Sequence, residues 1–137
     1  MRVKLETGKI RNDRIKKVEE ISCQNVYQCY QCGKCSAACP ATPEMDMLPN
    51  QVIRYLQLGL DDKVFEANTP WICASCLQCR SVCPKGVDLA RIMEAIRTLQ
   101  LRKGKNGIEI RTFSREYLAR APQIALISGY RKFLSLS

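Results

Sequence analysis

Apolar residues recur at helical spacing along much of this 137-residue chain. The clearest case is residues 88–103, where apolar side chains repeat every three or four positions. These are Leu89, Ile92, Met93, Ile96 and Leu99. Asp88 stands near the start of this segment and Gly104 just beyond its end, and both residue types favour those positions. The pattern predicts one long amphipathic helix.

A second helix is predicted between positions 48 and 59. Pro49 suits the first turn, and Gly59 suits the end. The apolar face is formed by Val52, Ile53 and Leu56. Asp61 is then expected to cap a short further helix that runs through Phe65.

The segments toward the two ends of the chain carry weaker patterns. Residues 13–22 predict a helix with Ile15, Val18 and Ile21 on one side, and residues 2–9 alternate like a short strand. Residues 110–120 predict an amphipathic helix that ends before Pro122, with Phe113, Tyr117 and Leu118 on its apolar face. The residues beyond Pro122 have no clear period, and we expect them to order only against a partner. The fold class is therefore mostly α.

The composition points to sulfur chemistry. The chain has nine cysteines and no histidine, so a metal would be held by thiolates rather than by imidazoles. An odd number of cysteines fits poorly with a closed disulfide framework, and the first ten residues contain no apolar stretch of the kind found in secretory signals. We expect a cytoplasmic protein. No uncharged stretch is long enough to predict a membrane span.

One internal repeat contains eight of the nine cysteines. The run Cys-x2-Cys-x2-Cys-x3-Cys-Pro occurs twice, with the second copy 44 positions after the first. The first copy consists of Cys29, Cys32, Cys35, Cys39 and Pro40, and the second of Cys73, Cys76, Cys79, Cys83 and Pro84. This run is the bacterial ferredoxin pattern for a [4Fe-4S] cluster. The sequence thus predicts two [4Fe-4S] clusters as cofactors.

In two-cluster ferredoxins the fourth cysteine of each run ligates the other cluster. The predicted ligands of cluster 1 are Cys29, Cys32, Cys35 and Cys83, and those of cluster 2 are Cys73, Cys76, Cys79 and Cys39. Two intervening residues let successive thiolates point inward while their backbone amides face the sulfurs. Gly33 is expected to allow close backbone approach. The alternative is a pair of zinc sites, which more often use separated Cys-x2-Cys pairs.

Two further residues near the motifs have ambiguous roles. Cys23 lies outside both runs and is interpreted as a small buried apolar residue, with a redox thiol or a contact with a partner's cofactor as the alternatives. Trp71 precedes the second run and is expected to pack over a cluster and exclude water from it.

The formal charge of +9 would favour an acidic partner or nucleic acid. Two oxidised clusters of about −2 each would lower it to about +5, and the basic stretches have few interleaved aromatic residues. We therefore expect no nucleic-acid binding. Residues 97–137 hold nine Lys or Arg against only Glu109 and Glu116, so this tail is a candidate partner-facing segment.

The residues around both motifs resemble a known family. The segments CYQCGKC, from Cys29, and WICASCLQCRSVCPKGVD, from Trp71, together with QLGL in the linker, are similar to HdrC, the small ferredoxin-like subunit of heterodisulfide reductase. The resemblance covers about residues 18–107. It implies an alpha-helical ferredoxin-type domain over residues 23–107, flanked by an N-terminal extension, 1–22, and a basic C-terminal extension, 108–137.

The resemblance also implies a function. In that family the two clusters pass single electrons from a flavin and iron-sulfur subunit (HdrA-like) to a cysteine-rich catalytic subunit (HdrB-like), which reduces a heterodisulfide. The chain would then be an electron-relay subunit of a soluble oxidoreductase complex, with no catalytic residues of its own. We expect the segments 1–22 and 108–137 to dock the partners. The alternatives are a relay subunit of a related sulfur-metabolism or other oxidoreductase complex, or a free ferredoxin-like carrier.

Overall fold

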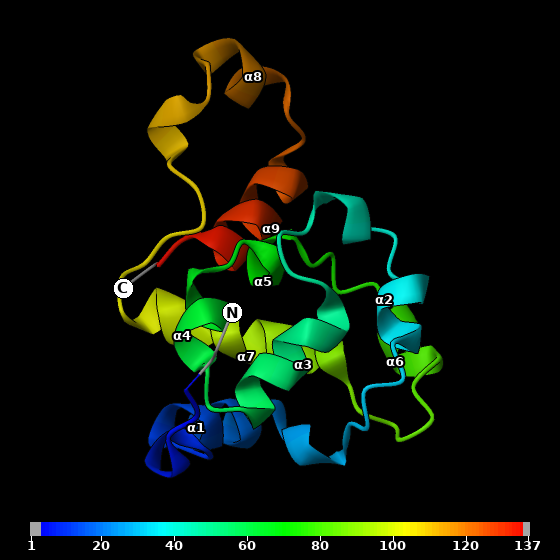
Figure 1. The fold of residues 1–137 in the computed structure, drawn as a ribbon. Helices are drawn as coiled ribbons and strands as arrows, with labels where there is room; N and C mark the ends of the chain where they lie inside the picture. The colour runs from blue at the N-terminus through cyan, green and yellow to red at the C-terminus, as the bar shows by residue number, and fades with distance from the viewer. Residues whose placement is uncertain (1–3, 136–137) are drawn as a thin grey trace. The chain divides into compact units, whose positions relative to one another are not determined.

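The computed structural model describes residues 4–135, and within this range it contains helices and no strand (Figure 1). It divides into two compact units, Met1–Ile96 and Arg97–Ser137, and each is described by itself. The first unit contains the α-helices α1 (Asp13–Ser22), α2 (Lys34–Ala38), α3 (Pro49–Gln57), α4 (Asp61–Glu66), α5 (Thr69–Ile72) and α6 (Gln78–Ser81). Helix α7 (Leu89–Arg102) begins in this unit, and α8 (Arg115–Arg120) and α9 (Gln123–Phe133) belong to the second. The mostly α prediction is confirmed.

Helix α1 occupies the residues predicted for it. The Asn12 side chain accepts a hydrogen bond from the Ile15 backbone N–H at 3.0 Å, which caps the first turn. Ile15 and Val18 are fully buried, whereas Ile21 is 37% exposed.

The strand expected before α1 is absent from residues 4–9, where Thr7–Lys9 form a turn of 3-10 helix, η1. A lone strand has no neighbour to satisfy its backbone groups, which is why weak alternation alone did not produce one. Residues 2 and 3 of that prediction lie outside the described part.

Helix α3 begins at Pro49 and ends at a glycine, as predicted. Gly59 has φ +72°, its N–H donates to the Leu56 carbonyl, and the Leu60 N–H reaches back to the Tyr55 carbonyl at 2.9 Å. This pair of bonds is a Schellman motif, which requires a left-handed residue. A side chain at position 59 would also meet the backbone of Lys9, because an added Cβ would lie 2.5 Å from the Lys9 carbonyl oxygen.

Asp61 does not cap α4 as expected. It is the first residue of that helix, after the N-cap residue Leu60, and it is almost fully buried. Its carboxylate accepts a hydrogen bond from the Asn12 side chain at 2.7 Å and pairs with Arg14 at 2.8 Å. Because these two groups from the α1 region engage the carboxylate, Asp61 links α4 to α1 rather than capping its own helix.

The long predicted helix is α7. Asp88 caps it by accepting a hydrogen bond from the Arg91 N–H at 3.2 Å, and Gly104, with φ +76°, ends it. Ile92 and Ile96 are fully buried and Met93 is 1% exposed, so the apolar face of α7 forms part of the core of the first unit together with α1 and α3.

The second unit differs from its prediction at two points. The single helix expected over residues 110–120 is divided into η4 (Ile110–Thr112) and α8, because the Ser114 hydroxyl accepts from the Tyr117 N–H and starts a new helix. Beyond Pro122 the chain forms α9, so the expectation that these residues order only against a partner was wrong. The end of α9 is held within its own chain by a bond from the Gly107 N–H to the Phe133 carbonyl at 2.8 Å.

Within residues 4–135, no helix combines the length and the apolar character that crossing a bilayer requires.

Candidate cluster-binding site

The two cysteine runs adopt the same unusual backbone. In the first run, Gln31 and Gly33 have φ of 65° and 77°, and in the second, Ser75 and Leu77 have φ of 55° and 62°. These pairs occupy equivalent positions of the sequence repeat. Left-handed backbone is rare for residues other than glycine, so its recurrence at both positions of both runs shows that the repeat is one of conformation as well as of sequence.

The second left-handed residue of each run leads into a short helix. Gly33 is the N-cap residue of α2, and Leu77 is the N-cap residue of α6. Helices α2 and α6 pack against each other, as Figure 1 shows. The third cysteine of each run, Cys35 or Cys79, lies on one of these helices, so their packing brings the two runs together.

A pocket at this junction is lined by cysteines of both runs. Its cysteines are Cys29, Cys32 and Cys35 from the first run and Cys79 and Cys83 from the second, and its other residues are Gly33, Asn50, Ile53, Val87 and Leu89. Cys83 thus lies in the same pocket as the first three cysteines of the other run. Cys39, Cys73 and Cys76 do not line it. Among the described residues, no group of three or more Cys, Asp or Glu side chains is arranged to hold a single metal ion.

Backbone and side-chain N–H groups point at the sulfur atoms of this pocket. The Gln31 N–H donates to Cys29 Sγ at 3.4 Å, the Gln31 side-chain amide does so at 3.5 Å, and the Val87 N–H donates to Cys83 Sγ at 3.3 Å. Such donors stabilise the negative charge of a thiolate and of the cluster bound to it. With eight cysteines in the two repeated runs and no histidine, the donor set fits iron-sulfur clusters.

Burial raises the pKa of two thiols at the junction. The pKa of Cys35 is raised mainly by desolvation, and desolvation raises the pKa of Cys79 to about 11. Without metal these thiols are protonated at neutral pH, so loading a cluster releases their protons.

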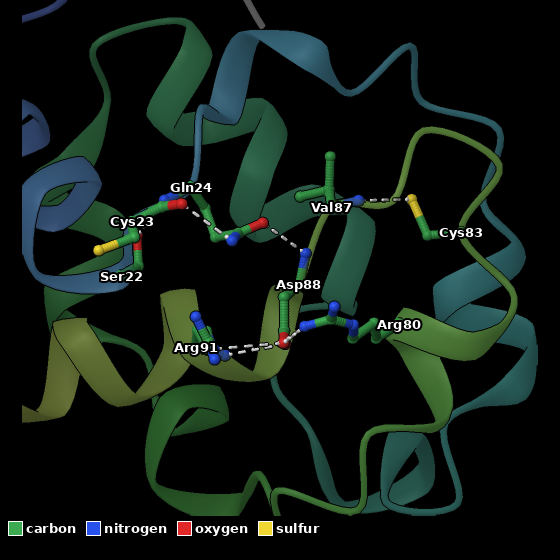
Figure 2. A network of polar contacts seen from close by, with 8 residues as sticks. All are labelled: Ser22, Cys23, Gln24, Arg80, Cys83, Val87, Asp88 and Arg91. Atoms are coloured by element: carbon green, nitrogen blue, oxygen red, sulfur yellow. Dashed lines mark hydrogen bonds and ion pairs between the residues drawn. The ribbon is translucent and has the colours of Figure 1, made fainter.

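Asp88 connects the second run to the rest of the unit (Figure 2). Its carboxylate is 2.8 Å from Arg80, the residue after Cys79, and its backbone N–H donates to the Gln24 side-chain oxygen at 2.8 Å. Asp88 was predicted only as a residue at the start of a helix, and Gln24 was not singled out. The sequence around Gln24 does not indicate that this side chain accepts a hydrogen bond from Asp88, because the two residues are 64 positions apart.

Cys23, Gly33 and Trp71 neighbour the site, and the sequence carried an expectation for each. Cys23 is exposed rather than buried, because it ends α1 in a left-handed conformation with φ 52°. Gly33 has a φ of 77° and no protein atom lies within 4 Å of a Cβ added there, while its close approach to a cluster stays a prediction. Trp71 is buried on α5, and its packing over a cluster stays a prediction.

Comparison with known proteins bears on this geometry. Residues 25–87 match the family model of the 4Fe-4S dicluster domain. The match favours iron-sulfur clusters over the zinc alternative, and the description "dicluster" agrees with two runs of four cysteines.

Curated relatives also match this chain. The chain is 37% identical over 86 residues to HdrC, the iron-sulfur subunit of the CoB–CoM heterodisulfide reductase, from Methanopyrus kandleri, which covers 63% of this chain and 43% of that protein. It is 34% identical over 83 residues to an HdrC-like protein of Archaeoglobus profundus, covering 60% and 44%. An HdrC of Methanocaldococcus jannaschii is 32% identical over 106 residues, covering 76% and 52%.

These relatives confirm the expected resemblance to HdrC of heterodisulfide reductase. The matches span about half the length of the relatives. The similarity therefore concerns only part of each relative.

Proposed function

We propose that this chain relays single electrons through two [4Fe-4S] clusters as a subunit of a heterodisulfide reductase-type complex. The observation that carries the proposal is the pocket that Cys79 and Cys83 of the second run line together with Cys29, Cys32 and Cys35 of the first. The similarity to the HdrC proteins of heterodisulfide reductases supports the type of complex. The clusters supply one-electron redox chemistry, and the chain holds, spaces and shields them.

The ligand sets of the proposal are crossed between the two runs. Cluster 1 is bound by Cys29, Cys32, Cys35 and Cys83, and cluster 2 by Cys73, Cys76, Cys79 and Cys39. Because α2 packs against α6 and Cys83 lines the pocket with the first run, a fourth ligand from the opposite run is within reach of cluster 1. Crossed ligation would join the two halves of the domain through metal bonds.

Substitution of the fourth ligands tests this assignment. In Cys83→Ser, we expect the electron paramagnetic resonance (EPR) signal of the cluster bound by the first run to change, and in Cys39→Ser that of the cluster bound by the second. Cys23→Ser is the matched control, and it should leave both signals and the iron content unchanged because Cys23 is exposed and belongs to neither set. If Cys39→Ser altered only the cluster of Cys29, Cys32 and Cys35, the crossed ligation would be wrong.

The proposed partners are a flavin and iron-sulfur subunit, which delivers electrons, and a cysteine-rich catalytic subunit, which consumes them. In this arrangement the chain has no catalytic residue of its own, since the eight cysteines of its two runs all serve as cluster ligands. Anaerobic purification of the native protein tests the proposal. Recovery with two such subunits supports it, whereas elution near 15.6 kDa without them would indicate a free carrier.

The second unit offers a docking surface for one partner. Its apolar groove is lined by side chains of α8, α9 and the segment before them, including Phe113, Leu118, Leu126 and Phe133. The same unit is strongly basic, with exposed Arg111, Arg115 and Arg120 near the groove in sequence. These two properties together fit an amphipathic partner segment with acidic residues along its edge.

Charge reversal tests this docking surface in the assembled complex. Replacing Arg111, Arg115 and Arg120 with Glu should abolish co-purification of one partner while the iron content stays unchanged. The matched control reverses Arg54, Lys63 and Lys103, which are exposed and lie outside both segments expected to dock partners. Retention of both partners by the first variant would refute the docking surface and leave the relay function untouched.

A further inference from the structure

The fourth ligands of the two runs differ in their hydrogen bonding. The Val87 N–H donates to Cys83 Sγ at 3.3 Å, four positions after the cysteine. The equivalent position after Cys39 is Pro43, which has no N–H to donate. This donor is therefore a feature of the second run alone, and the repeated cysteine pattern does not account for it.

The position of the Val87 amide is fixed by the next residue, Asp88, which is 1% exposed (Figure 2). The Asp88 backbone N–H donates to the Gln24 side-chain oxygen at 2.8 Å, and its carboxylate pairs with Arg80 at 2.8 Å. The same carboxylate accepts from the Arg91 N–H at 3.2 Å and so caps α7. Asp88 is thus held from three sides, by the end of α1, by α6 and by α7.

Each contact restrains the short segment that follows Cys83. A backbone N–H in a buried setting costs free energy when it loses its acceptor, so removing the Gln24 oxygen would drive the Asp88 amide to seek another partner. The Val87 amide belongs to the adjacent peptide unit and would move with it. The hydrogen bond to Cys83 Sγ therefore depends on Gln24, although Gln24 lies outside both cysteine runs.

We propose that Gln24, Asp88 and Arg80 are positioning residues that hold the Val87 amide on Cys83 and thereby raise the reduction potential of the single cluster that Cys83 ligates. This inference rests on the proposed function, in which Cys83 is a cluster ligand. Reduction adds a negative charge to the cluster and strengthens its thiolates as acceptors, so an N–H directed at a thiolate stabilises the reduced state more than the oxidised one.

Redox titration of the loaded protein, monitored by EPR, tests the proposal in Gln24→Leu. We expect the equilibrium constant for reduction of one cluster to fall about tenfold, which is a shift of about 59 mV to lower potential for one electron. The shifted cluster should be the one whose signal changes in Cys83→Ser. Gln28→Leu is the matched control, because Gln28 is exposed and lies directly before the ligand Cys29, and it should leave both potentials unchanged.

A second measurement uses the unsubstituted chain and so does not depend on how Gln24→Leu folds. In protein labelled with nitrogen-15 valine, pulsed EPR should detect hyperfine coupling from a labelled amide at one cluster. The coupling should vanish in Val87→Ala, in which alanine keeps the N–H but carries no label. Absence of any nitrogen-15 coupling would overturn the proposal. A Gln24→Leu protein that loads both clusters would also overturn it if the equilibrium constant for reduction changed less than twofold for both clusters, or by the same factor for both.

The two failures can be told apart. If the unsubstituted protein loads two clusters and only the potentials or couplings disagree, the positioning role is wrong and the relay function stands. If it does not load two clusters, or if Cys83→Ser alters neither of them, the ligand assignment in the proposed function fails first.

Discussion

Replacing Gly59 with alanine should destabilise the first unit through two separable effects. Gly59 has φ +72° at the end of α3, and an alanine Cβ there would lie 2.5 Å from the Lys9 carbonyl oxygen and 2.6 Å from its carbon. Left-handed backbone costs a residue other than glycine about 1–2 kcal/mol, of which about 0.4–1 kcal/mol is recovered because alanine restricts the unfolded chain. Displacing packed neighbours costs a further 1–3 kcal/mol or so.

The expected loss for Gly59→Ala is therefore about 2–4 kcal/mol. Gly104→Ala is the matched control, because Gly104 ends α7 with φ +76° and no atom lies within 4 Å of an added Cβ. It should lose only about 1 kcal/mol, since it carries the conformational cost alone. The difference between the two variants isolates the contact with Lys9.

The assay is chemical unfolding of the loaded protein under argon, followed by far-ultraviolet circular dichroism, together with limited trypsin digestion. In Gly59→Ala, cleavage after Lys9 and Arg11 should accelerate, because the segment before α1 must move away from α3. Equal destabilisation of Gly59→Ala and Gly104→Ala, with no change in cleavage, would refute the close approach of Lys9 to Gly59.

Three further predictions concern single side chains. In the loaded protein a maleimide should label one thiol, that of the exposed Cys23. After the clusters are removed by chelation under reducing conditions, it should label all nine thiols. Labelling of several thiols in the fully loaded protein would contradict the ligand sets. Arg14→Met should destabilise the first unit by about 1–2 kcal/mol in the same unfolding assay, because it leaves the buried Asp61 carboxylate with one partner fewer. The control Lys16→Met breaks only an exposed ion pair and should cost less than about 0.5 kcal/mol. Leu77→Gly should stabilise the protein by about 0.5 kcal/mol, since it relieves a left-handed backbone at a side chain that is 51% exposed, and a loss above about 1 kcal/mol would show that the leucine side chain itself is needed.

The helices with strong periodicity could be predicted from the sequence. Helices α1, α3 and α7 lie where the spacing of apolar residues places them, and the glycines at 59 and 104 end the last two. Weaker signals failed where local side-chain bonds decided the outcome. Ser114 starts a helix in the middle of a continuous apolar pattern, and nothing in that pattern reveals that its hydroxyl caps the Tyr117 N–H.

Asp61 illustrates the same limit within the first unit. An aspartate before a short helix favours a cap, but the carboxylate binds Asn12 and Arg14, which are nearly fifty positions away in the chain. Cys23 was misjudged for a related reason. Free cysteines are usually buried, yet this one sits at the left-handed end of α1, where the chain turns and its side chain faces solvent.

The sequence by itself determined the chemistry of this protein. Eight cysteines at repeated spacing, in a chain without histidine, specify thiolate ligation of iron-sulfur clusters, because spacing along the chain is a local property. The tertiary structure decided which groups surround those cysteines. Packing of α2 against α6 placed Cys83 with the first run, and the contacts of Asp88 with Gln24 and Arg80 aligned the Val87 amide. Those contacts join residues up to 64 positions apart, and their geometry arises only when the helices pack.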